Sequence, residues 1–96
     1  MGVYVDDMQA KFGRMIMCHM VADSTEELLE MVDKIGIDRK WIQQPGTVHE
    51  HFDIAKTKRA LAIEHGAKPV SQRQLSLILK DRRLREAAAK QNSGPV

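Results

Sequence analysis

The sequence predicts a single small α/β domain with the element order β-β-α-β-α-β-α, in which helices pack on a mixed sheet. Three observations support this prediction. The chain has 96 residues, enough for one domain with a modest core. Short apolar runs typical of strands alternate with segments of helical spacing, and the helical segments follow capping residues. We expect the domain to cover residues 1–92 and residues 93–96 to form a flexible tail.

Composition excludes several classes of protein. Hydrophobic residues make up 43% and charged residues 29% of the chain, which is typical of a globular domain. Cys18 is the only cysteine, so an internal disulfide is excluded and a reducing compartment is indicated. No apolar run approaches the roughly 20 residues of a membrane span, and the first residues lack a signal-peptide pattern. We therefore expect a cytoplasmic protein without a membrane partner, and the modest core favours a homo-oligomer.

Charge is distributed unevenly, although the net charge is only +2. Residues 1–38 hold 3 basic and 8 acidic residues, whereas residues 39–96 hold 12 basic and 5 acidic residues. A basic half can hold an anion, but scattered charges more often form solvated surfaces.

Residues 3–5 form a β-branched and aromatic run that predicts a short strand ending at Asp6 and Asp7. Neighbouring residues of an extended chain point to opposite sides, so only one of these carboxylates is expected to face a site. The segment that follows is too short for a parallel crossover, so the next strand, residues 15–22, is expected to return antiparallel. Both of its faces are apolar, as in a buried central strand, and His19 is its only polar side chain. Such a histidine is more often a hydrogen-bonded core residue than a ligand.

Two overlapping capping boxes, beginning at Asp23 and Ser24, predict the start of the first helix, with Asp23 as a cap. Gly36 then predicts the end of that helix. Trp41 to Gln43 is expected to be the third strand, reached from the second through a βαβ crossover. The helix therefore joins two strands in this prediction.

The segment from His49 carries a possible metal-binding pattern. If the segment is extended, His49, His51 and Asp53 lie on one side, and together with His19 they could bind zinc or another divalent ion. Histidine clusters without cysteine or a defined loop are poor predictors, and Asp53 is also expected to cap a helix over residues 54–65. We therefore expect neither a metal nor a cofactor. A metal-dependent hydrolase or transferase that uses His19, His51 and Asp53 is the alternative.

The second helix also suggests an anion site. Lys56 and Arg59 are three residues apart and lie close together on one helix face. Free amides at the start of a helix, together with nearby cations, favour phosphate. Asp53 argues against this site, because a capping carboxylate would occupy the same amides.

The C-terminal part is expected to contain an edge strand at Pro69 and a third helix that begins at a capping box from Ser71. This helix has a short apolar stripe and then a polar, basic end with Arg82, Arg83 and Arg85. Nucleic-acid binding through this helix is a second alternative. We expect nucleic acid to be an unlikely partner, because the chain has few aromatic residues and no reader motif.

Five motifs carry a resemblance to a known family. They are Val-Tyr-Val-Asp-Asp, Cys-His-Met-Val-Ala-Asp-Ser-Thr-Glu-Glu-Leu, Arg-Lys-Trp-Ile-Gln, His-Phe-Asp and Lys-Arg-Ala-Leu-Ala-Ile-Glu-His-Gly-Ala. From Val3 to about Ala67 the chain thereby resembles a small bacterial and phage family known only as a domain of unknown function. The resemblance implies no activity, and Phe52 stands where the family has tyrosine. The positions that match polar or aromatic residues of the family are Asp6, Asp7, His19, Asp23, Trp41, Gln43, His51, Asp53 and Arg59.

We expect a small-molecule-binding protein that holds an anionic, phosphate-bearing ligand such as a nucleotide, in order to sequester it. Trp41 would stack on a ring, and the cations would neutralise the phosphate. Binding is favoured over catalysis, so no catalytic residue is assigned. The expected ligand-binding residues are Asp6, His19, Asp23, Lys40, Trp41, Gln43, His51, Asp53, Lys56 and Arg59.

Overall fold

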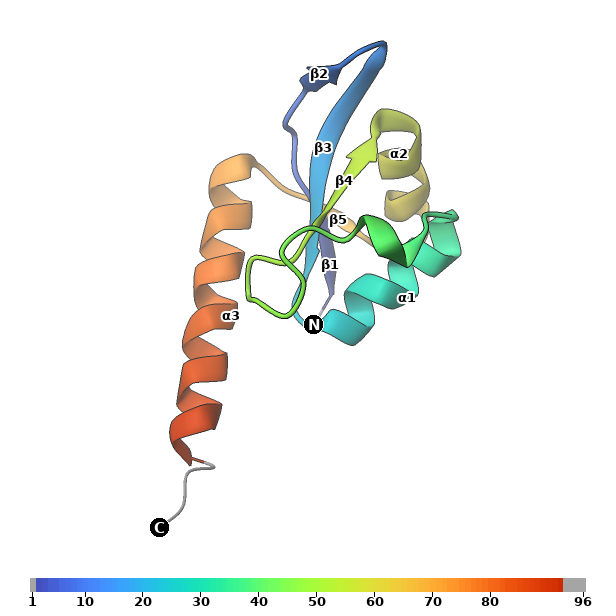
Figure 1. Cartoon of the computed structure of the whole chain (residues 1–96). Helices are drawn as coiled ribbons and strands as arrows, with labels where there is room; N and C mark the ends of the chain where they lie inside the picture. The colour runs from blue at the N-terminus through green and yellow to red at the C-terminus, as the bar shows by residue number, and fades with distance from the viewer. Residues whose placement is uncertain (1, 93–96) are drawn as a thin grey trace.

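The long strand β3 (Met15–Ala22) organises the structure, a computed structural model that describes residues 2–92 (Figure 1). Four shorter strands complete the sheet: β1 (Val3–Val5), β2 (Ala10–Phe12), β4 (Phe52–Ala55) and β5 (Lys68–Pro69). The helices are α1 (Thr25–Ile35), the short 3-10 helix η1 (Arg39–Trp41), α2 (Lys56–Glu64) and α3 (Gln72–Asn92). The chain is a small α/β domain with a mixed sheet and three α-helices in the described part, as the sequence predicts. The expected tail, residues 93–96, lies outside the described residues.

Strand β3 has strand neighbours on both of its edges. β1 pairs antiparallel with residues 20–22 and β2 pairs antiparallel with residues 15–17. β4 pairs antiparallel with residues 17–20, so it overlaps both of them along β3 and must occupy the opposite edge. β5 pairs parallel with β1, which makes the sheet mixed. The predicted antiparallel return from β1 to β3 and the predicted edge strand at Pro69 are therefore confirmed.

Helices α1 and α2 lie on one side of the sheet, and α3 lies on the other (Figure 1). Alternate residues of β3 and β4 point into the core between the sheet and the first two helices, where α1 contributes its apolar face. The largest of these buried side chains are Met20, Phe52, Leu28 and Ile54. Only the end of β3, residues 20–22, is buried on both faces, whereas Met15 at its start is 48% exposed.

The start of α1 follows the sequence closely. The Ser24 hydroxyl accepts a hydrogen bond from the amide of Glu27 and donates one to its carboxylate. Gly36 ends the helix in the left-handed conformation, with φ at 78°. Ser24 is therefore the cap, and Asp23 accepts a hydrogen bond from the Tyr4 hydroxyl instead, at 2.9 Å.

The predicted strand at Trp41 to Gln43 is wrong. Residues 39–41 form the 3-10 helix η1, because the Asp38 carboxylate accepts a hydrogen bond from the Lys40 amide and initiates a helical turn. Gln43 forms a single antiparallel bridge with His51. The strand that follows α1 is β4, and it runs antiparallel to β3, so α1 is not part of the predicted βαβ crossover.

The predicted cap at Asp53 is also wrong. Asp53 lies within β4, and α2 begins two residues later than expected, after Ala55, which makes no side-chain capping bond. Burial of Phe52 and Ile54 on the core face explains this outcome, because a strand places both in the core and turns Asp53 to the opposite face. None of the described helices combines the length and the apolar character of a membrane-spanning segment.

Candidate functional site

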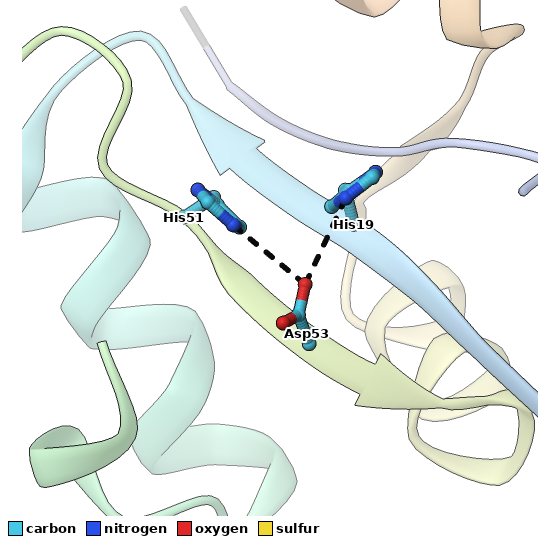
Figure 2. Close-up of side chains that lie close together, drawn as sticks. All are labelled: His19, His51 and Asp53. Atoms are coloured by element: carbon cyan, nitrogen blue, oxygen red, sulfur yellow. Dashed lines mark ion pairs between the residues drawn. The ribbon is translucent and has the colours of Figure 1, made fainter. Parts of the chain in front are cut away.

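Three of the expected site residues meet on the face of the sheet away from α1 and α2 (Figure 2). His19 of β3 and Asp53 of β4 are directly paired in the strand register. His51 lies two residues before Asp53 and so points to the same face. One side-chain atom of each residue lies within 4.8 Å of the other two. The pairing of two strands thus brings together residues that are more than thirty positions apart in sequence.

The distances within this cluster leave room between its members. Asp53 Oδ1 lies 3.8 Å from His19 Nε2 and 3.6 Å from His51 Nε2, and both distances exceed that of a normal hydrogen bond. The two imidazole rings meet edge to face, with centroids 5.3 Å apart. Zinc bonds of about 2.0–2.1 Å in a tetrahedral site put ligand atoms about 3.3–3.4 Å apart. Small side-chain rotations would therefore bring the three atoms onto one ion.

Each histidine is held through its other ring nitrogen. His19 Nδ1 lies 2.8 Å from the Asp6 carboxylate, and His51 Nδ1 lies 2.8 Å from the backbone carbonyl of His49. A carbonyl or an ionised carboxylate can only accept, so Nδ1 must carry the proton in both rings. In a neutral ring the lone pair then lies on Nε2, and in both rings Nε2 is the nitrogen placed beside Asp53. Metal-binding histidines are normally oriented by such a partner on the second nitrogen.

Asp6 is buried and held by several hydrogen bonds. It is 1% exposed, and its carboxylate also accepts hydrogen bonds from the amides of His19 and Met8. Arg59 Nε donates to the backbone carbonyl of Asp6 at 2.9 Å. Of the Asp6-Asp7 pair, Asp6 contacts His19 of the cluster, whereas Asp7 accepts a hydrogen bond from the Gln72 amide.

An open groove of about 900 Å³ begins at His19 and Asp53 and extends to Trp41. Gln43 also lines it. Trp41 is 60% exposed, so it is not the core residue that a lone tryptophan usually is. Lys40 places its ammonium 5.2 Å from the centroid of the Trp41 ring, a cation–π distance. His19, Trp41, Gln43 and Asp53 thus share one surface feature.

The remaining expected site residues lie elsewhere. Lys56 and Arg59 line a second, smaller hollow of about 100 Å³. Asp23 lies near α3, with Arg85 Nη2 3.5 Å from its carboxylate. The structure therefore does not bring Arg59 and Trp41 into one pocket. His49 lies in the turn before β4 and contributes only its backbone carbonyl to the cluster.

Cys18 has the opposite orientation to His19 and is 2% exposed, in the core. Burial raises the pKa of its thiol to about 11, and the negative charge of Asp6 adds to this effect. The thiol is protonated at neutral pH, which suits neither nucleophilic attack nor metal binding.

Sequence reasoning missed a buried ion pair beside the cluster. Arg82 of α3 lies 3.6 Å from the carboxylate of Glu50, and both side chains are almost completely buried. Thr25 donates a hydrogen bond to Glu50 and lies 3.3 Å from Arg82. An arginine that continues the apolar stripe of α3 after Leu75 and Ile78 was the available signal. Arg82 therefore anchors α3 and is not part of a solvated cationic face.

The comparisons with known proteins identify the family and no activity. Residues 3–82 match the family described as "Protein of unknown function (DUF4031)", so the chain belongs to this family. The match extends beyond the segment from Val3 to Ala67 that carries the resemblance in sequence, and it includes the first part of α3. Comparison with curated proteins gave no significant match, and neither did comparison with solved structures.

Proposed function

We propose that this protein binds a divalent transition-metal ion through His19, His51 and Asp53 and uses it for hydrolysis or group transfer. One observation supports this proposal above the others: both imidazoles have Nδ1 engaged, so both Nε2 atoms are available beside the same carboxylate oxygen. Two imidazoles and one carboxylate suit zinc, manganese or iron.

The exposure of the cluster fits a reactive centre better than a structural one. The side chains of His19 and Asp53 are 32% and 42% exposed, and an open groove adjoins them. Structural zinc sites are closed by four protein ligands, whereas catalytic sites keep a position for water or substrate. A bound ion would supply Lewis acidity and lower the pKa of a coordinated water. Asp6 and the His49 carbonyl would keep the two imidazoles oriented.

The competing arrangement is an ion pair without metal. In that case the Asp53 carboxylate would pair with protonated imidazoles, and the cluster would only stabilise the β3–β4 edge. Elemental analysis of the purified protein, followed by calorimetric titration with Zn²⁺ after chelation, separates the two arrangements. We expect one ion per chain and near-complete loss of binding in His51→Ala.

The chain offers a matched control for this experiment. His49→Ala removes an imidazole two residues away but keeps the backbone carbonyl that orients His51. We expect His49→Ala to bind the ion as the unaltered protein does. Failure to bind any of Zn²⁺, Mn²⁺ and Fe²⁺ would contradict the proposal. Binding by His51→Ala that equals binding by the unaltered protein would also contradict it.

The proposal also includes catalysis and assembly. Hydrolysis of chromogenic phosphate and carboxylate esters should require the loaded ion and should disappear in His51→Ala. The expected homo-oligomer remains part of the proposal, and native mass spectrometry of freshly purified protein reports subunit number, metal and retained ligand in one measurement.

A further inference from the structure

The groove beside the histidine–aspartate cluster has the composition of a binding surface for a ring. Three methionines, Met8, Met15 and Met17, line it together with Trp41 and Ile37. Methionine side chains are flexible and polarizable, so they adapt to ligands of different shapes and favour contact with aromatic rings. The indole is exposed on the groove, where it can stack on a planar group. This end of the groove therefore favours a flat, apolar body.

The net charge of the groove depends on whether an ion is bound at the cluster. Lys11 and Lys58 contribute two positive charges, and Asp38 and Asp53 contribute two negative charges. These four charges balance, and the Lys40 ammonium beside Trp41 adds one positive charge near the groove. A divalent ion at the cluster would add a charge of +2 at the His19 end. The largest positive charge would then lie at the His19 end of the groove.

We propose that the groove binds a phosphate ester that carries a planar ring, with the ring against Trp41 and the methionines and the phosphate directed at the ion. This inference rests on the proposed metal centre. The groove volume of about 900 Å³ is near the upper end of the usual range for small-molecule sites, so a ligand of nucleotide size fits. Because the ion would supply most of the positive charge, phosphate-ester binding and ion binding must strengthen each other reciprocally.

The fluorescence of Trp41, the only tryptophan, provides the first test. The protein is titrated with 5′-AMP, adenosine and ribose 5-phosphate, each with and without one equivalent of Zn²⁺. We expect a saturable change in emission with 5′-AMP and Zn²⁺. The affinity should fall at least about tenfold when the ion, the phosphate or the ring is missing, as loss of one charge-assisted or stacking contact requires.

A pair of variants tests the position of the ring. In calorimetric titrations with 5′-AMP and Zn²⁺, Trp41→Ala should weaken binding about 10- to 100-fold, the range of one stacking contact. Leu61→Ala is the control, because Leu61 is an exposed apolar residue of α2 that does not line the groove. It should leave the affinity unchanged, and both variants should bind Zn²⁺ as the unaltered protein does.

The outcomes separate this inference from the proposed function. If Zn²⁺ binds stoichiometrically but 5′-AMP does not, the inference is overturned and the metal centre stands. Equal binding of 5′-AMP with and without Zn²⁺, or equal binding of adenosine and 5′-AMP, also overturns it. If none of Zn²⁺, Mn²⁺ and Fe²⁺ binds, the proposed function fails, and this inference fails with it.

Discussion

The two halves of the candidate site are built in different ways. His19, His51 and Asp53 lie on or beside two paired strands, and backbone hydrogen bonds fix their relative positions. Trp41 lies on η1, outside the regular sheet. That segment is held by local contacts, including an exposed salt bridge in which Arg39 Nη2 lies 2.6 Å from the Asp33 carboxylate. Arg39 donates two hydrogen bonds to this carboxylate, but both side chains are more than half exposed, so solvent screens the pair.

The difference shows how rigidity is distributed in a small domain. A metal centre requires ligand atoms placed within a few tenths of an ångström, and paired strands can provide this. A groove for an organic ligand tolerates adjustment, and a surface turn with methionine neighbours permits it. We therefore expect truncation of a buried side chain in the strand half to affect the fold and truncation of Trp41 in the turn half to affect only binding.

The largest contrast is expected between Phe52→Ala and Trp41→Ala. Phe52 is 0% exposed and lies between His51 and Asp53 in β4, so its truncation leaves a cavity and should lower the free energy of unfolding by about 4 kcal/mol. Trp41 is mostly exposed, so its truncation should cost no more than about 0.5 kcal/mol. Urea denaturation of both variants, followed by circular dichroism, measures the difference.

Equal destabilisation by the two substitutions would show that the turn half is as tightly packed as the strand half. If Phe52→Ala does not fold, Phe52→Leu provides the comparison, because it keeps most of the buried apolar volume. The loss of stability in Phe52→Leu should lie between the losses in Phe52→Ala and Trp41→Ala.

The second contrast concerns the attachment of the loop that precedes β4. Glu50 is the residue before His51, and its only described cationic neighbour is Arg82. Arg82→Ala leaves this carboxylate buried without its partner, so the free energy of unfolding should fall by about 3 kcal/mol. Arg83→Ala removes the same charge from an exposed neighbouring position and should change stability by less than about 0.5 kcal/mol. Similar unfolding free energies for Arg82→Ala and Arg83→Ala would mean that Arg82 does not anchor α3.

The sequence predicted β3 but neither β4 nor η1, for physical reasons. Side chains of an extended chain alternate with a period of two, so the assumption of an extended segment correctly predicts that His51 and Asp53 share a face, whereas His49 lies in a turn. Trp41-Ile42-Gln43 has β propensity, but the Asp38 cap and the absence of a full partner strand decide its local structure. Contacts between residues far apart in the chain cannot be predicted from one sequence. The strand pairing of His19 with Asp53 and the ion pair of Glu50 with Arg82 are therefore seen only in the structure.

The orientation of His19 gives a smaller and more specific prediction. Asp6→Asn removes the charge that holds His19 Nδ1, and loss of such a partner typically lowers metal affinity about 10- to 100-fold. Asp7→Asn is the matched control, because it neutralises the neighbouring exposed carboxylate and should leave the affinity unchanged. Calorimetric titration with Zn²⁺ measures both. Unfolding curves must show that Asp6→Asn remains folded under the same conditions, and an unchanged affinity in folded Asp6→Asn would remove Asp6 from the site.

The smallest effect is expected at high pH and concerns Tyr4 of strand β1. Burial raises the pKa of Tyr4 to about 12, and its hydrogen bond to Asp23 acts in the same direction. Tyr4 is the only tyrosine, so the ultraviolet absorbance of tyrosinate reports its ionisation directly. We expect ionisation near pH 12 in the folded protein and near pH 10 in the unfolded chain.

The sign of the effect on stability follows from this difference. The protonated phenol is favoured in the folded state, so the contribution of Tyr4 is fully present below about pH 10 and is lost as the pH rises towards 12. Lysines also titrate in this range, but both the unaltered protein and Tyr4→Phe contain them, so their effect cancels in the comparison. The difference in unfolding free energy between the unaltered protein and Tyr4→Phe should therefore shrink between pH 10 and 12. A difference that stays constant would mean that Tyr4 ionises at its ordinary pKa, with no effective contact to Asp23.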